Sequence, residues 1–411
     1  MSRRVVLWVA FAAVHLGVAW LGFLMPNGPM GDVYNVYDPW SAQALTGAGV
    51  VGVTEEWVYP QLALAPMILA HAFAWISGYI VGWAILVTLV DAVAFAVLVG
   101  AARSAGRTTA AWFWLAYTAL LGPVGLYRLD GFTVPLVLIA CLWLVGRPWL
   151  ASILMAVATW IKVWPAAVLA AALIAVRRRG AMIGGAVAVS VLTLAAIAFA
   201  GGAEHAFGFL AEQSARGLQV EAVVGTPYLW GALLGLDGFW VYWDPGIVAF
   251  QVTGADIDPV IAAMTPILAV VAAAVALLGG WAAARGARFA ALFPPLSLAL
   301  VTALIVFNKV GSPQYLTWLI PPMALGLVID RRRWVLPATV ALVAALATQL
   351  VYPLLYDGIL SPALLPVAIL TFRNATLVAL FVWMLVRLVR LLRTPSAPAT
   401  PSSAEPRESS C

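Results

Sequence analysis

The sequence predicts an all-α polytopic membrane protein, and three observations lead to this fold class. Hydrophobic residues make up 64% of the chain and charged residues only 9%, with a mean hydropathy of +1.01. Apolar runs recur from Val5 to Leu392 with short polar breaks between them. When these runs are threaded through a membrane as about twelve helices, the Lys and Arg residues fall almost wholly on one side, as cytoplasmic loops require.

The expected elements follow in chain order. Residues 5–25 have spanning length behind Arg3 and Arg4 and no convincing cleavage signal, so a retained signal-anchor with a cytoplasmic N-terminus is expected. The later apolar runs predict crossings near residues 79–101, 109–122, 132–145, 149–161, 164–176, 182–200, 259–284, 291–307, 315–329, 334–351 and 375–389. The tail, residues 394–411, is rich in Pro and Ser and is expected to be disordered, which leaves one membrane domain over residues 1–393.

The two runs that flank Lys162 are shorter than a usual span of roughly 17 to 25 residues. A broken helix that reaches partway out from the cytoplasm and returns is therefore the alternative to two complete crossings. Both interpretations bring the chain back to the inside before Arg177.

A long outward segment, residues 26–78, contains a second apolar stretch at residues 59–76. If this stretch crossed the membrane, Arg103 and Arg107 would face outside, against the bias of the later loops. An interfacial helix that begins at Pro60 and lies on the outer surface is expected instead.

Five cations do not follow the inward bias. Of the 22 Lys and Arg residues, 17 fall on the cytoplasmic side, and the other five are Arg128, Lys162, Arg216, Lys309 and Arg373. A basic group near the outer face of a bundle usually has a partner, so together they predict an anionic ligand. Of the 17 Asp and Glu residues, 13 lie in outward segments. The net charge of +5 thus describes a cytoplasmic rim, and nucleic acid is not an expected partner.

Three of the five cations also have a simpler interpretation. Lys162 stands between two tryptophans, so its ammonium group is equally able to snorkel to the interface. For Arg216 and Arg128, local ion pairs with Glu212 and Asp130 are the alternative.

The second long outward segment, residues 201–258, mixes acidic residues with aromatic ones. The aromatic residues are Trp230, Trp240, Tyr242 and Trp243. Aromatic rings beside carboxylates suit a sugar, whose C–H faces stack and whose hydroxyls hydrogen-bond. Anchoring at the membrane interface is the alternative.

Histidines, cysteines and buried acids give no further site. Cys141 lies in an apolar run and Cys411 ends the chain, so no disulfide is expected. His15 and His71 are expected to be hydrogen-bonded core residues, and Asp91 needs a partner within the bundle. No metal site and no cofactor are predicted, and a divalent ion bridging a carboxylate and a phosphate is left open.

The polar segments carry short motifs in a fixed order. These are Gly31-Asp32-Val33-Tyr34-Asn35-Val36-Tyr37 with Trp40, Trp57-Val58-Tyr59-Pro60, Lys162-Val163-Trp164-Pro165, Arg216-Gly217-Leu218-Gln219-Val220-Glu221 and Asn308-Lys309-Val310-Gly311-Ser312-Pro313-Gln314. In this order the chain resembles, over most of its length, the GT-C membrane glycosyltransferases. It most closely resembles glycosyltransferase family 87, the polyprenol-phosphate-mannose-dependent mannosyltransferases of actinobacteria. The resemblance implies a GT-C-like bundle whose first extracytoplasmic loop carries an interfacial helix.

The resemblance also implies roles for particular residues. Asp32 occupies the position of the family's catalytic base, and Tyr59-Pro60 that of the element opening its juxtamembrane helix. The chain departs from the family at Gln61, where a second proline is common, and Ser312-Pro313-Gln314 is also similar to the eukaryotic GPI-type mannosyltransferases. The expected site comprises Asp32, with Asp38 as the alternative base, phosphate contacts from Lys162, Lys309, Arg373 and Arg216, and substrate contacts from Tyr37, Trp57, Tyr59, Glu221 and Gln314.

Two functions are compatible with these residues. Sugar transfer from a lipid phosphate needs one base for the acceptor hydroxyl and cations for the departing phosphate. The sequence therefore predicts a glycosyltransferase that moves a sugar, mannose by the resemblance, from a polyprenyl-phosphate donor to a glycolipid acceptor. It would act at the outer face of the plasma membrane, with both termini in the cytoplasm. The alternative is a transporter or flippase of a lipid-linked or anionic solute, which needs polar groups along a mid-membrane path. Only Asp91 lies that deep. A helix-end or turn role is the simpler reading of Asp32.

Overall fold

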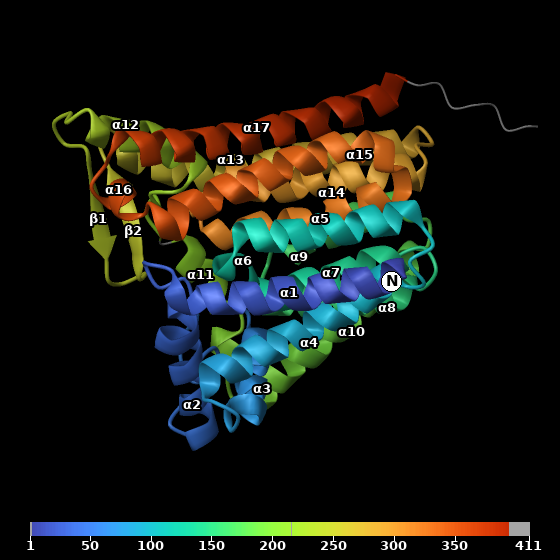
Figure 1. The fold of residues 1–411 in the computed structure, drawn as a ribbon, viewed down its shortest axis with the longest axis horizontal. Coiled ribbons are helices and arrows are strands. Elements are labelled where there is room, and N and C mark those ends of the chain that lie inside the picture. The colour runs from blue at the N-terminus through green and yellow to red at the C-terminus, as the bar shows by residue number, and fades with distance from the viewer. Residues whose placement is uncertain (1, 215, 394–411) are drawn as a thin grey trace, which may run out of the picture.

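The computed structural model describes residues 2–214 and 216–393, with side chains at all of these positions except 212–214. Within these ranges seven helical stretches are long and apolar enough to cross a membrane. They are α1 (Arg3–Leu24), α4 (Tyr79–Val99), α10 (Arg179–Phe199), α13 (Ile257–Ala284), α14 (Phe289–Val306), the stretch Pro313–Leu354 that contains α15 (Ile320–Gln349), and α17 (Leu364–Arg393). The chain is a helical membrane protein, as the apolar runs predict, and most of these long helices lie roughly side by side (Figure 1). The count of twelve crossings stays a prediction.

Shorter helices complete the bundle. These are α5 (Ala105–Leu121), α6 (Pro123–Leu126), α7 (Asp130–Trp143), α8 (Pro148–Ile161) and α9 (Pro165–Ala175). The chain between α8 and α9 is broken at Lys162, which has extended backbone angles and caps the end of α8. Proline at the first position of each helix suits these starts, because the first turn leaves its N–H groups unpaired in any case. The break at Lys162 fits both interpretations, and the choice between two crossings and one broken helix stays a prediction.

The predicted crossings at residues 315–329 and 334–351 are joined within α15. The backbone leaves the helical region at Asp330, with φ of −144° and ψ of 77°. A side chain at Gly326 would overlap the ring of Trp334, so the segments on either side of the break pack against each other. The arginines of residues 331–333 lie at this break.

The last helix begins earlier than the sequence predicts. Its expected start was residue 375, whereas α17 begins at Leu364, so Arg373 lies inside the helix rather than in a loop. The Nη2 atom of Arg373 donates a hydrogen bond of 3.0 Å to the main-chain carbonyl of Glu221. This partner from outside the helix offsets part of the cost of burying a charge within it.

The expectation of an all-α fold is wrong in one detail. Trp240–Asp244 forms strand β1, which pairs antiparallel with β2, Ala249–Thr253. Pro245 and Gly246 separate two runs of aromatic and β-branched residues, which is the composition of a hairpin. This hairpin is not predicted from the sequence, because its residues lie among acidic ones that suggest a loop.

The remaining elements lie outside the long helices. They are η1 (Val33–Tyr37), α2 (Asp38–Thr46), η2 (Gln61–Ala63), α3 (Leu64–Ala74), η3 (Ala203–His205), α11 (Gly208–Ser214), η4 (Val223–Gly225), α12 (Thr226–Leu233), η5 (Pro313–Leu319), η6 (Leu350–Leu354) and α16 (Asp357–Leu360). Helix α3 covers most of the apolar stretch expected to be interfacial, and it packs on α4, where Tyr79 donates a hydrogen bond to the Met67 carbonyl. Its orientation in the membrane stays a prediction.

The molecule has two chemically different ends. The start of α1 and the end of α17 lie at one end of the bundle, and β1, β2 and α16 lie at the opposite end (Figure 1). At the first end Arg285 donates to the Leu392 carbonyl at 3.1 Å, and Arg387 to the Arg333 carbonyl at 2.5 Å. We call this end the basic rim. The opposite end, where Asp32 follows α1, is called the outer end, because the charge bias of the sequence predicts that it faces outward. The tail expected to be disordered, residues 394–411, falls outside the described residues.

Candidate active site

The connection between α6 and α7 lies at the centre of the outer end. Its three residues Tyr127, Arg128 and Leu129 are buried, and the chain turns so tightly that a Cβ at Gly131 would overlap the carbonyl of Leu126. This close approach requires glycine. The turn presents two charged side chains, Arg128 and Asp130, to different partners.

Arg128 forms an ion pair with Asp32, the expected base, which directly follows the loop after α1. The Asp32 side chain is 33% exposed and the Arg128 side chain 9% exposed. The carboxylate therefore has one side on a buried guanidinium and another open to a substrate. The alternative base, Asp38, lies elsewhere: its Oδ1 atom is 3.9 Å from His71 Nε2, and it makes no ion pair with the five cations in the described part of the chain.

Lys162 is bound to Asp130 rather than reaching for the surface. Its Nζ donates to Asp130 Oδ2 at 2.6 Å, and both side chains are buried. The alternative of a local ion pair between Arg128 and Asp130 is wrong, because Arg128 pairs with Asp32 and Asp130 pairs with Lys162. The other alternative, an ion pair between Arg216 and Glu212, stays a prediction, because the Glu212 side chain lies outside the described ones.

Residues 218–222 form a segment at the outer end, which we call the strap. It carries Glu221, whose main-chain carbonyl accepts the hydrogen bond from Arg373 of α17. On one side the main-chain N–H of Val220, on the strap, donates to a carbonyl of β2. The N–H of Val252, on β2, donates to a carbonyl of the strap. On the other side Gln219 N donates to the Lys309 carbonyl at 2.9 Å, and Gly311 N donates to Gln219 Oε1 at 2.9 Å. The strap is thus held from both sides, which fixes the positions of the residues it carries.

Burial raises the pKa of the Glu221 carboxyl to about 7, while Arg373 and Arg128 act in the opposite direction. The side chain is therefore close to two of the five cations, although they come from different elements. A carboxyl that titrates near neutral pH is able to change its charge under ordinary conditions.

The remaining cations join the same cluster through Arg216. Burial lowers the pKa of the Lys309 ammonium, and the charge of Arg216 lowers it further. Burial also raises the pKa of the Tyr59 hydroxyl, where Tyr315 adds to the effect and Arg216 opposes it. The Tyr59 ring in turn lies 6.0 Å from Lys162 Nζ. All five cations that the sequence places against the inward bias are thus brought to one region.

Aromatic residues from the first outward segment form one wall of this region. Tyr37 packs on Trp83 with ring centres 4.8 Å apart, and its hydroxyl accepts a hydrogen bond from Leu129 N. Trp57 packs edge-on against Tyr59 at 5.6 Å. Three of the expected substrate contacts therefore lie together, whereas Gln314 is buried at the start of η5, with its carbonyl bound by Thr317.

Several buried donors at the outer end have no partner among the described residues. These include the Nε atoms of Arg128, Arg216 and Arg373 and the Nε1 atom of Trp57. A buried donor without a partner is unfavourable, so each of these N–H groups needs a partner such as water, an ion or a ligand. Three guanidinium groups with an unused N–H are suited to an anion.

Sequence reasoning missed Asp130, Tyr315 and Trp318. Asp130 was read as a local partner of Arg128, and the two aromatic residues fall in a run read as a membrane crossing. The available signal was a carboxylate at the outer start of a short apolar helix, where an acid needs a nearby cation.

The aromatic hairpin lies beside the strap. Trp240, Tyr242 and Trp243 are exposed on β1, and Trp230 donates to Thr371 at 2.9 Å. Sugar contact and interfacial anchoring both stay predictions for this surface.

Asp91 and the histidines His15 and His71 have polar partners. His15 Nε2 and Asp91 Oδ2 share a hydrogen bond of 3.1 Å, and His15 Nδ1 lies 2.9 Å from the carbonyl oxygen of Phe11. His71 contacts Ser41 at 2.8 Å. Residues 2–214 and 216–393 contain no group of three or more His, Cys, Asp or Glu residues arranged to hold a metal ion.

The site thus combines one accessible carboxylate, five gathered cations and an aromatic wall. No curated protein and no solved structure matches the chain significantly. The family model for glycosyltransferase family 87 does match, over residues 57–306, which include α4 to α14 and therefore Arg128, Lys162, Arg216 and Glu221. Since this match spans more than half of the chain, the protein is a membrane glycosyltransferase that belongs to glycosyltransferase family 87.

Proposed function

We propose that the protein transfers mannose from a polyprenyl-phosphate donor to a hydroxyl of a glycolipid acceptor, at the outer face of the plasma membrane. The observation that carries this proposal is the gathering of five cations in one region, where Arg128 is paired with Asp32 and three guanidinium Nε atoms have no partner among the described residues. A lipid phosphate is an anion that reaches a membrane-embedded site, and several charge-assisted hydrogen bonds would hold it there.

The transfer is a single displacement. Asp32 takes the proton of the acceptor hydroxyl while the acceptor oxygen bonds to the sugar C1 atom. The bond between C1 and the phosphate oxygen breaks, and the lipid phosphate leaves with the electron pair. Lys162, Lys309, Arg216 and Arg373 stabilise the negative charge that develops on it. Because a phosphate leaves readily, no protein acid is required, and the configuration at C1 inverts.

Arg128 has a place in this scheme because it touches the base and retains an unused donor. An anion bound by its Nε atom would lie next to the carboxylate of Asp32. Base and leaving group must flank the same carbon in a displacement, so a shared arginine would bring them to the required proximity.

A transporter or flippase is less well supported. Such a protein needs a polar path at mid-membrane depth, and Asp91 is already paired with His15 there. The cavity beside Asp91 has a volume of about 20 Å³, which holds a water molecule but not a sugar.

The direct test is transfer itself. Purified protein or right-side-out vesicles would be incubated with radiolabelled polyprenyl-phosphate-mannose and a lipid extract, with Asp32→Asn as the inactive control. Labelled glycolipid is expected from the wild-type protein alone. Loss of label from the donor without any glycolipid product, or equal product from the variant, would contradict the proposed acceptor or base.

Sidedness needs a separate measurement. Single cysteines near Asn27, Gly202 and Asp357 are expected to react with an impermeant reagent on intact cells. Cysteines near Arg179 and Arg332, at the basic rim, are expected to stay unlabelled. Strong labelling near Arg179 would place the site on the cytoplasmic side.

A further inference from the structure

Asp130 is a fully buried carboxylate with both oxygens engaged. It is the first residue of α7 and has no exposed surface. Oδ2 accepts a hydrogen bond from Lys162 Nζ at 2.6 Å, and Oδ1 accepts one from Trp318 Nε1 at 2.6 Å. One side chain thereby connects α7, the break between α8 and α9, and the 3-10 helix η5.

The ammonium group held by Asp130 lies among aromatic rings. Its Nζ atom is 5.2 Å from the ring centre of Tyr315, 5.9 Å from that of Trp318 and 6.0 Å from that of Tyr59. Trp318 stacks on Tyr315 at 4.1 Å and on Trp164 at 5.6 Å. Asp130 therefore fixes the cation and, through Trp318, part of the aromatic frame around it.

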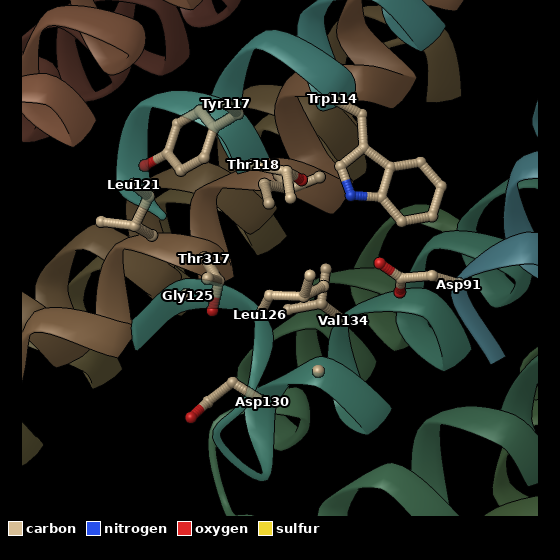
Figure 2. Close-up of a pocket in the computed structure, with 12 residues that line it drawn as sticks. Asp91, Trp114, Tyr117, Thr118, Leu121, Gly125, Leu126, Asp130, Val134 and Thr317 are labelled. Carbon is tan, nitrogen blue, oxygen red and sulfur yellow. The ribbon is translucent and has the colours of Figure 1, made fainter. Parts of the chain in front are cut away.

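Behind Asp130 lies a small cavity whose opposite side carries a second buried carboxylate, Asp91 (Figure 2). Its volume of about 20 Å³ is enough for a single water molecule. The two carboxylates have similar burial, but Asp91 pairs with His15, whereas Asp130 pairs with Lys162. The chain thus contains a matched comparison for Asp130 across the same cavity.

We propose that Asp130 is a positioning residue that holds the Lys162 ammonium group, within the frame of Tyr59, Tyr315 and Trp318, ready to bind the phosphate of the lipid donor. This inference rests on the proposed function. Asp130 itself does not touch substrate, because both of its oxygens are engaged inside the protein. It acts through Lys162.

The physical reason is the flexibility of lysine. A free lysine side chain has four rotatable bonds and loses rotamer entropy when it is fixed. A carboxylate that fixes the ammonium group before the donor arrives removes that cost from binding. A buried ion pair is weak grounds for stability by itself, since desolvation offsets much of the attraction, so a role in binding is the better account of this pair.

The experiment is a double-mutant cycle of Asp130→Asn, Lys162→Met and the double variant. Two quantities would be measured: the KM and kcat of transfer from polyprenyl-phosphate-mannose, and the affinity for polyprenyl monophosphate followed by tryptophan fluorescence. Each single variant is expected to weaken donor binding by about tenfold or more, with a smaller change in kcat. The double variant is expected to be no weaker than Lys162→Met alone, because Asp130 acts only through Lys162.

The matched control is Asp91→Asn. It removes a carboxylate of equal burial from the other side of the cavity, so it is expected to lower the thermal stability in detergent and leave donor affinity unchanged. If Asp130 were only structural, Asp130→Asn would behave in the same way, or its effect would multiply with that of Lys162→Met. Either result would overturn the proposal.

A conservative variant covers the case in which Asp130→Asn fails to fold. Asp130→Glu keeps the charge and adds one methylene group, and it is expected to retain more lipid-phosphate affinity than Asn or Ala at this position. Affinity equal to that of the uncharged variants would count against a positioning role. A wild-type protein that binds polyprenyl monophosphate but transfers no mannose would refute the proposed function, while the binding cycle would still decide the role of Asp130.

Discussion

The basic rim and the outer end use cations in opposite ways. At the rim, arginine side chains donate to main-chain carbonyls in the last turns of helices. Arg107 donates to Val97 and Leu98 at the end of α4, Arg179 to Ile174 at the end of α9, and Arg285 to Leu392 at the end of α17. These carbonyls have no partner within their own helices, and a cation there also complements the helix dipole.

At the outer end most of the cations are buried, and two of them are paired with carboxylate side chains. Arg128 binds Asp32, Lys162 binds Asp130, and several guanidinium donors stay unused among the described residues. A cation that donates its hydrogen bonds to carbonyls at helix ends serves folding and the orientation of the chain in the membrane. A buried cation with N–H groups that have no partner is suited to binding a ligand. The same residue type therefore has two roles, and its surroundings distinguish them.

The largest expected effect distinguishes a catalytic base from a structural residue at Asp32. Asp32→Asn keeps size and hydrogen-bonding capacity but removes the basicity, so transfer is expected to fall by about 10²- to 10⁴-fold while the protein folds and binds donor. The matched control is Asp38→Asn, on the same segment but beside His71, which is expected to stay active. Near-normal turnover in Asp32→Asn, or a large loss in Asp38→Asn alone, would move the base to Asp38.

The next effect compares cations at the two ends directly. Lys162→Met and Lys309→Met are each expected to weaken donor binding by about 1.5 to 3 kcal/mol, the value of a charge-assisted hydrogen bond. Arg179→Met removes a rim cation and is expected to leave the donor KM unchanged. Equal KM shifts for all three variants would mean that overall charge, rather than the gathered site, determines donor binding.

A smaller effect comes from pH. The pKa of Glu221 is raised from an ordinary 4.5 to about 7 in the folded protein, so the folded state holds this proton more tightly than the unfolded state. This contribution to stability is complete below about pH 4.5 and is lost as the pH rises through about 7. Glu221→Gln is expected to flatten that part of the thermal-stability profile in detergent. Identical profiles for the two proteins would refute the burial argument.

The smallest effect is expected at the rim. Arg107→Met removes two hydrogen bonds to the end of α4 and a favourable interaction with its dipole, the latter worth about 0.3 to 1 kcal/mol. Thermal unfolding of the variant is expected at a slightly lower temperature, with unchanged transfer kinetics. A marked loss of activity without loss of stability would show that the rim takes part in catalysis.

Much of this comparison is visible in the sequence. Apolar runs locate the helices because length and hydropathy decide which segments enter a bilayer, and the charge bias singles out the five unusual cations. The break at Lys162 is predicted from the shortness of its flanking runs. These signals are local or additive along the chain, which is why a single sequence reveals them.

The pairing of the charges is not visible in the same way. Adjacency favours Arg128 with Asp130, whereas the turn sends these side chains to Asp32 and Lys162. The frame residues Tyr315 and Trp318 come from a run that is apolar enough to hide them. Partners far apart in the chain depend on tertiary packing, and neither composition nor periodicity records it.

The break at Lys162 has a consequence for the surrounding lipid. Helix α8 has 14 residues and α9 has 11, so at 1.5 Å per residue they extend about 21 Å and 17 Å from the rim, against a hydrocarbon core about 30 Å thick. The ammonium group between them would then lie below the outer surface of an undeformed bilayer. Hydrophobic mismatch of this kind is relieved when lipids thin beside the short helices. If α8 and α9 form the broken helix that the sequence leaves open, the local thickness of the bilayer would therefore set how deep Lys162 lies below the lipid headgroups.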